Sequence, residues 1–148
     1  MKISGTFEIL NTIGEVSSIL NNMFNMRRCL PYLEEWDLID YNKAKAVFRL
    51  KIGSLEPLVA NVVITMESKE DGSFIFIFEG NVKGIEYRGR LDISLKSSGD
   101  STLVSWEAVL ELDRLLRILG DIVDIEELIN NITKEAIRSF AECASRTL

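Results

Sequence analysis

Residues 85–95 read Ile-Glu-Tyr-Arg-Gly-Arg-Leu-Asp-Ile-Ser-Leu, and a polar residue occupies every second position of this stretch. Successive side chains of a β-strand point to opposite faces of a sheet, so the alternation predicts a strand with one buried and one solvated face. The same period of two starts at Leu33 and continues for about eighty residues. We therefore predict that strands dominate the centre of the chain.

Short polar segments interrupt the alternation and indicate the turns between strands. They lie at residues 41–43, 53–57, 67–72 and 97–100, and the third of them ends in Asp-Gly. Strands that follow one another through such short turns pair as antiparallel neighbours. Residues 2–10 alternate as well and add a strand at the beginning of the chain. The prediction is a seven-stranded antiparallel sheet.

Two short helices are predicted directly after the first strand. Asn11 or Thr12 can cap the first of them, and Glu15 stands at capping-box distance from Thr12. The second covers about residues 23–29 and stops before Pro31, because the residue before a proline is disfavoured in helical conformation.

A long amphipathic helix is predicted from Asp121 to the end of the chain, after a turn at residues 114–119 and a kink or break at Gly120. Its polar face carries Glu127, Asn131 and Glu135. The apolar stripe on the opposite face contains Ile122, Ile125, Ile129, Ile132, Ala136, Phe140 and Cys143.

The predicted fold is α+β: one helix-grip domain over residues 1–148, with a curved antiparallel seven-stranded sheet wrapped round the long C-terminal helix. Such a sheet encloses more volume than one row of side chains fills, and apolar ligands bind in cavities of this kind. We expect the cavity to be lined by Phe48, Leu50, Val62, Ile64, Phe74, Phe76, Phe78, Tyr87, Leu91, Trp106, Ile129, Ile132, Ala136 and Phe140. For any one of these residues, ordinary core packing is the alternative.

Composition excludes several classes of function. The net charge is −6, from 17 Lys and Arg against 23 Asp and Glu, which disfavours nucleic-acid binding. Histidine is absent, and with it the commonest general base and metal ligand. We expect no metal site. No stretch approaches the roughly 20 apolar residues of a membrane span, and the N-terminus lacks a signal-peptide pattern. The expected location is the cytoplasm, with peripheral contact at the inner face of the membrane as an alternative.

Two cysteines, Cys29 and Cys143, could pair if the fold brings them together. Two cysteines alone cannot form a zinc site. In an intracellular chain we expect two buried thiols.

No catalytic residue is expected. Glu79, Glu107 and Glu111 fall on the outward faces of their strands, where a solvated surface explains them, and no nucleophile has a neighbouring base. Tyr87 and Trp106 each bring a donor that a buried position must satisfy, so they are the strongest candidates for ligand contact. We expect a binding protein rather than an enzyme; the alternatives are a cyclase- or hydratase-type enzyme and a docking protein with a filled core.

Two surfaces are candidates for contacts with partners. A short amphipathic, locally basic segment at the expected cavity mouth could contact anionic lipid or a partner protein, or simply pack on the long helix. It comprises Met23, Phe24, Met26, Arg27, Arg28 and Leu30. Four apolar residues, Val59, Val63, Ile75 and Ile77, share the outward face of the sheet and favour a homodimer that buries them.

Several motifs resemble those of a known family. Residues 1–9, Met-Lys-Ile-Ser-Gly-Thr-Phe-Glu-Ile, are close to its N-terminal strand, and residues 20–31 match the spacing of its Leu-Asn-Asp-Pro…Ile-Pro-Gly region. Gly53 matches the glycine of its Val-Gly-Pro turn, and Glu79-Gly80 matches its Gly-Glu-Gly. In this order the motifs resemble the START-like, polyketide-cyclase (SRPBCC) superfamily, and within it the G-subunit family of carbon monoxide dehydrogenase.

This sequence departs from the family pattern at a few positions. Asn22-Met23 replaces Asp-Pro, Ser54 replaces the proline after Gly53, and Tyr32 replaces the glycine after the second proline. The resemblance implies a non-catalytic accessory of a molybdenum hydroxylase of the carbon monoxide dehydrogenase type. Its implied roles are maturation or membrane recruitment of that enzyme and handling of a lipophilic electron acceptor. No resident cofactor is implied, other than a bound quinone or lipid.

Overall fold

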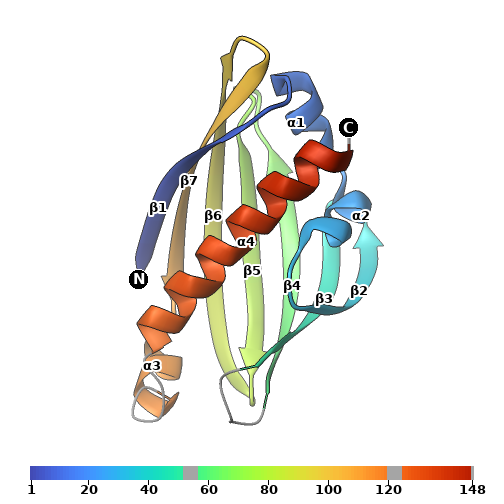
Figure 1. Cartoon of the computed structure of the whole chain (residues 1–148). Coiled ribbons are helices and arrows are strands. Elements are labelled where there is room, and N and C mark those ends of the chain that lie inside the picture. The colour runs from blue at the N-terminus through green and yellow to red at the C-terminus, as the bar shows by residue number, and fades with distance from the viewer. Residues whose placement is uncertain (52–56, 120–124, 148) are drawn as a thin grey trace.

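The computed structural model describes residues 1–51, 57–119 and 125–147. Its strands form one antiparallel sheet in the order β1-β7-β6-β5-β4-β3-β2 (Figure 1). Their bounds are β1 Lys2–Ile9, β2 Leu33–Asp40, β3 Lys43–Leu50, β4 Leu58–Ser68, β5 Phe74–Val82, β6 Ile85–Ser98 and β7 Ser101–Glu111. The predicted seven-stranded sheet is confirmed. It is open, because β1 pairs with the last strand and leaves β1 and β2 at the edges.

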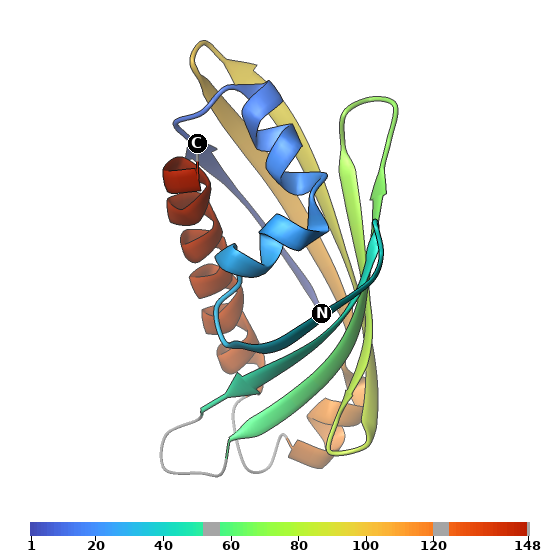
Figure 2. The ribbon, with the colours of Figure 1, turned by 90° about the vertical axis from the view of Figure 1, so that its right-hand side faces the viewer.

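The helices are α1 Ile13–Leu20, α2 Met23–Met26, the 3₁₀ turn η1 Arg27–Cys29, α3 Asp113–Leu119 and α4 Ile125–Thr147. Figures 1 and 2 show α1, α2 and α4 on the same face of the sheet, with α4 running diagonally across it. We call this the inner face. The turn predicted at residues 114–119 is instead the helix α3, while the predicted break at Gly120 and the stripe residue Ile122 lie outside the described residues.

Local capping explains where the first two helices begin. The hydroxyl of Thr12 accepts from the Glu15 backbone N–H at 3.4 Å, and the Glu15 carboxylate accepts from the Thr12 N–H at 3.3 Å. This is the predicted capping box. The Asn22 side chain accepts from the Asn25 N–H at 3.1 Å and caps α2 in the same way. Both helices therefore start within a few residues of β1 and pack on one end of the inner face.

Most of the core lies at that end. The buried residues that pack together there, called the first core cluster, are Ile9, Val16, Ile19, Leu20, Met23, Met26, Ala44, Ala46, Val62, Ile64, Met66, Phe74, Phe76, Ile93 and Val104. A smaller second core cluster contains Ala60, Val82, Ile85 and Leu112. Burial of these side chains is the main favourable term in folding.

The outer face corrects one premise of the dimer prediction. Ile75 is only 4% exposed within the single chain, although its side chain is on the outward face. Its cross-strand partners are Glu67 and Asp92, and Arg90 interacts with both of these carboxylates. The stems of these long side chains cover apolar surface, so Ile75 needs no second protomer to be buried. Val59, Val63 and Ile77 are half-buried.

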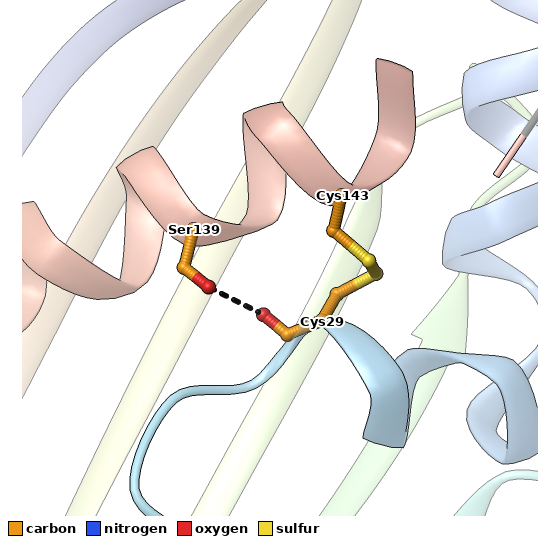
Figure 3. Close-up of a disulfide and its surroundings, with 3 residues drawn as sticks. All are labelled: Cys29, Ser139 and Cys143. Carbon is orange, nitrogen blue, oxygen red and sulfur yellow. Dashed lines mark hydrogen bonds between the residues drawn. A yellow bond between two sulfur atoms is a disulfide. The ribbon is translucent and has the colours of Figure 1, made fainter. Parts of the chain in front are cut away.

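A disulfide joins Cys29 to Cys143, across 114 residues of sequence, with a Cα–Cα distance of 5.3 Å (Figure 3). The expectation of two free thiols was wrong. Cys29 is buried as predicted, but α4 returns to η1 and brings Cys143 alongside it. The Ser139 hydroxyl donates to the Cys29 carbonyl at 3.3 Å and ties the same two segments together. Disulfides are rare in a reducing cytosol, so the bond also counts against the expectation of a cytoplasmic location.

Candidate functional site

Five large side chains of the inner face are half-buried rather than buried. They are Phe48, Phe78, Tyr87, Leu91 and Trp106, and we call them the central surface. Phe48 and Tyr87 pack against both core clusters, so the central surface lies between the two clusters. Since these side chains stand on the face that α4 covers, their uncovered area lies beneath the helix.

Two aromatic rings of this surface lie along the sheet, over glycines of the neighbouring strands. A Cβ added at Gly5 would stand 3.0–3.1 Å from atoms of the Trp106 indole. A Cβ added at Gly80 would stand 3.0 Å from the Tyr87 hydroxyl and 2.0 Å from the Asn61 carbonyl oxygen. The two glycines are cross-strand partners of Trp106 and Tyr87. Their missing side chains let the rings cover backbone instead of rising towards α4.

The helix α4 contacts the core at its two ends. Ile129 packs on the second core cluster, and Phe140 and Ala141 pack on the first. Ile132 and Ala136, between them, are half-buried and are not among the described residues that pack on either cluster. None of the described α4 side chains, residues 127–143, is fully buried. The middle of the helix therefore faces the central surface without closing on it.

The predicted cavity residues separate into two groups. Val62, Ile64, Phe74 and Phe76 are buried in the first core cluster. The other ten are half-buried: Phe48, Leu50, Phe78, Tyr87, Leu91, Trp106, Ile129, Ile132, Ala136 and Phe140. The second group contains the central surface and the helix stripe above it.

A pocket of about 380 Å³ lies between the α2–η1 segment and the edge strand β2. It is lined by Phe24, Arg27, Leu33, Glu34, Trp36 and Leu38. Of the residues predicted at the cavity mouth, Phe24 and Arg27 line this pocket, Arg28 is exposed and Leu30 is half-buried. Met23 and Met26 instead turn into the core, at 1% and 8% exposure.

Four pocket residues, Leu33, Glu34, Trp36 and Leu38, were not among the predicted site residues. All four belong to β2, whose pairing with β3 shifts register between Leu33 and Glu35 and again between Leu38 and Asp40. Alternation in the sequence identifies a strand but does not indicate that it lies at an edge, where α2 can stand opposite it. Trp36 at the start of the strand was the only signal available.

Two donors of this pocket are buried without an acceptor among the described residues: Arg27 Nε and Trp36 Nε1. The Arg27 guanidinium carbon lies 4.3 Å from the centroid of the Phe24 ring, in cation–π contact. Glu34 is already engaged, because Arg49 donates to its two oxygens at 2.8 and 3.3 Å. The Arg49 hydrogen bond lowers the pKa of the Glu34 carboxyl.

Tyr87 is the one titratable group of the central surface. Burial raises the pKa of its phenol to about 12, so the hydroxyl is neutral at physiological pH. Within the described part of the chain, no hydrogen bond to this hydroxyl is present, and no group of three or more His, Cys, Asp or Glu side chains could hold a metal. The outward carboxylates Glu79 and Glu107 form ion pairs with Arg88 and Lys2, both at 3.4 Å.

Comparison with protein families gives one match, to the model described as CoxG, the G subunit of carbon monoxide dehydrogenase, over residues 5–148. The chain belongs to the CoxG family. The predicted family is therefore confirmed. No curated protein matches the sequence.

Solved structures share the START-like, helix-grip fold. A conserved protein from Geobacillus kaustophilus superposes with a TM-score of 0.80 at 16% identity, covering 99% of this chain and 94% of its own. A START superfamily protein from Mycobacterium smegmatis gives 0.65 at 12% identity, covering 97% and 94%. The di-domain ARO/CYC BexL from the BE-7585A biosynthetic pathway gives 0.58 at 15% identity, covering 98% of this chain and 48% of its own. At these identities the likeness shows the fold.

In the described residues of this CoxG-family chain, no helix has both the length and the apolar composition needed to cross a membrane.

Proposed function

We propose that this CoxG-family chain binds and carries a hydrophobic small molecule, of the lipid or quinone class, between the central surface and α4. One observation carries the proposal: α4 contacts the core at Ile129 and at Phe140, while Ile132 and Ala136 stand over half-buried aromatic side chains. Apolar surface on both sides of one space gains free energy when an apolar molecule replaces water there.

A matched pair of variants on α4 tests this proposal. Ala136→Phe places a ring over the central surface, whereas Asn131→Phe places the same ring on the exposed side of the helix. Thermal unfolding is followed with a fatty acid, an isoprenoid alcohol and a short-chain quinone as probes. We expect at least one probe to raise the melting temperature of the wild type and of Asn131→Phe, and to lose that effect in Ala136→Phe. If no probe shifts the wild type, the docking-protein alternative replaces the proposal.

Family membership supports an accessory role for the carried molecule. We propose that the chain serves a molybdenum enzyme of the carbon monoxide dehydrogenase type, in its maturation, its membrane recruitment or the handling of its lipophilic electron acceptor. Phe24, 49% exposed beside the exposed Arg28, is the proposed point of contact with enzyme or membrane. Co-elution with the purified enzyme and co-sedimentation with anionic vesicles test the two contacts, and Phe24→Asp should weaken whichever contact exists.

A cyclase-type enzyme is the second candidate, and the Tyr87 hydroxyl favours it. This hydroxyl is neutral, has no partner among the described residues, and belongs to the central surface. If it acts as a general acid, Tyr87→Phe should reduce turnover by about a hundredfold or more while binding persists. A carrier should lose only the few-fold in affinity that one hydrogen bond supplies.

A further inference from the structure

We propose that the pocket between α2–η1 and β2 binds the anionic head group, a carboxylate or a phosphate, of an amphiphile whose apolar chain lies on the central surface. The inference rests on the proposed function and adds to it the chemical class of the ligand.

The unpartnered donors indicate what is missing from the pocket. Arg27 Nε and Trp36 Nε1 come from two separate elements, η1 and β2, and both residues line the same pocket. A buried N–H without an acceptor is unfavourable, and in native proteins nearly all such groups are paired. Both donors require an oxygen acceptor, and a carboxylate or phosphate offers at least two oxygens.

Charge favours an anion over a neutral oxygen. The pocket contains one cation, Arg27, and one carboxylate, Glu34, and the carboxylate is already bound by Arg49 at 2.8 Å. The Phe24 ring against the Arg27 guanidinium covers one face of that group, which leaves its edge for hydrogen bonding. A guanidinium edge binds carboxylate and phosphate through parallel N–H···O bonds, which are stronger than bonds to neutral acceptors. Because the whole chain carries a charge of −6, an anion is attracted only by such a local arrangement.

The remaining walls of the pocket favour an apolar chain on that head group. Leu33, Trp36 and Leu38 belong to the inner-face side of β2 and pair with Phe48, Ala46 and Ala44 of β3. Phe48 is the first residue of the central surface met on crossing the sheet from this edge. The volume of about 380 Å³ lies within the range of small-molecule sites, about 300–1,000 Å³. An amphiphile can therefore place its head at Arg27 and Trp36 and its chain over Phe48.

Three probes with the same twelve-carbon chain test the head group: laurate, dodecyl phosphate and 1-dodecanol. Dissociation constants are measured by calorimetry below the micellar concentration. We expect the wild type to bind at least one of the two anions about tenfold or more tightly than the alcohol, as charge-assisted hydrogen bonds require. The preferred anion identifies the head group.

Variants assign that preference to the pocket. Arg27→Gln and Trp36→Phe should each reduce it, the first by removing the cation and the second by removing only the indole N–H. Arg28→Gln, an identical charge change at the exposed neighbour, should leave it unchanged. Circular dichroism checks that each variant is folded, and Trp36→Phe keeps the test decisive if Arg27→Gln is not.

Two results overturn the inference in distinguishable ways. Equal binding of all three probes, unaffected by Arg27→Gln and Trp36→Phe, removes the head-group site but leaves the proposed carrier function intact. Binding of none of the probes, nor of the neutral probes used for the carrier function, removes both.

Discussion

The two halves of the inner face are covered in different ways. Under α1 and α2 the core is closed, with Val16, Leu20 and Phe76 at 0–2% exposure. Under α4 the central surface and the helix residues above it stay half-buried. Short helices that begin within a few residues of a strand pack tightly on it, whereas α4 spans a distance and contacts the core at its ends. The difference suggests that stability is concentrated at one end of the molecule and binding at the other.

The largest expected effect concerns what holds α4 in place. If packing contributes little along the middle of α4, the Cys29–Cys143 bond should contribute much. A disulfide that closes a loop of this length, 114 residues apart in sequence, lowers the entropy of the unfolded chain by an amount equivalent to about 4–5 kcal/mol. We expect urea unfolding with a reductant to show a loss of this size. The Cys29→Ser/Cys143→Ser double variant should unfold identically with and without reductant. A loss below about 1 kcal/mol would indicate that packing alone holds α4.

A pair of phenylalanines on one strand compares the two regions directly. Phe76 and Phe78 share the inward face of β5, but Phe76 is buried and Phe78 is half-buried. Phe76→Ala should cost about 3–5 kcal/mol, as truncation of a buried aromatic does. Phe78→Ala should cost clearly less, because its contacts are incomplete. Chemical denaturation measures both, and equal losses would show that the central surface is as tightly packed as the first core cluster.

Ligand binding should reduce the difference between the regions. At a free concentration about 100 times Kd, a ligand of the folded state stabilises it by about 2.7 kcal/mol. We expect this gain in thermal or denaturant unfolding with the best probe. Ile132→Ala, in the middle of α4, should reduce the gain, whereas Ile19→Ala in α1 should lower the starting stability and leave the gain intact. The reverse pattern would place the ligand under α1.

The smallest effect concerns water at the central surface. Burial raises the pKa of Tyr87 to about 12, against about 10 in the unfolded chain. Below pH 10 both states keep the proton, so this group has no effect on stability. Between pH 10 and 12 only the unfolded state loses it, so stability falls as the pH rises. Relative to Tyr87→Phe, the wild type should lose about 1.4 kcal/mol between pH 9 and pH 11. Parallel curves for the two proteins would indicate that water reaches the phenol freely.

Alternation and short turns were sufficient to predict the sheet, because each strand of an antiparallel meander is fixed by its neighbours in sequence. The Thr12–Glu15 cap was visible for the same reason: both residues lie within one helical turn. The family departure at Tyr32 also has a structural counterpart. Its φ of 64° lies in the left-handed region that favours the glycine of the family pattern.

Features that depend on distant segments were not predictable. The Cys29–Cys143 bond joins residues whose spacing carries no periodic signal, and the pocket requires α2 to stand opposite an edge strand. Parity assigned Ile75 to the outer face correctly, but its burial depends on how Arg90 reaches Glu67 and Asp92. Which inward residues are half-buried depends on where α4 lies, and no sequence period determines that.

Under mechanical load, the disulfide would limit how far the chain can be drawn out. Cys29 and Cys143 enclose β2 to β7 and most of α4 in a covalent ring, so tension applied at the two ends passes through the sulfur atoms and bypasses that ring. Only the segment before Cys29 and the few residues after Cys143 can extend, about 120 Å in total at roughly 3.6 Å per residue. With the bond reduced, all 148 residues can extend, to about 530 Å. In a force-extension trace, the bond would make β1, α1 and α2 the only elements that a pull can remove.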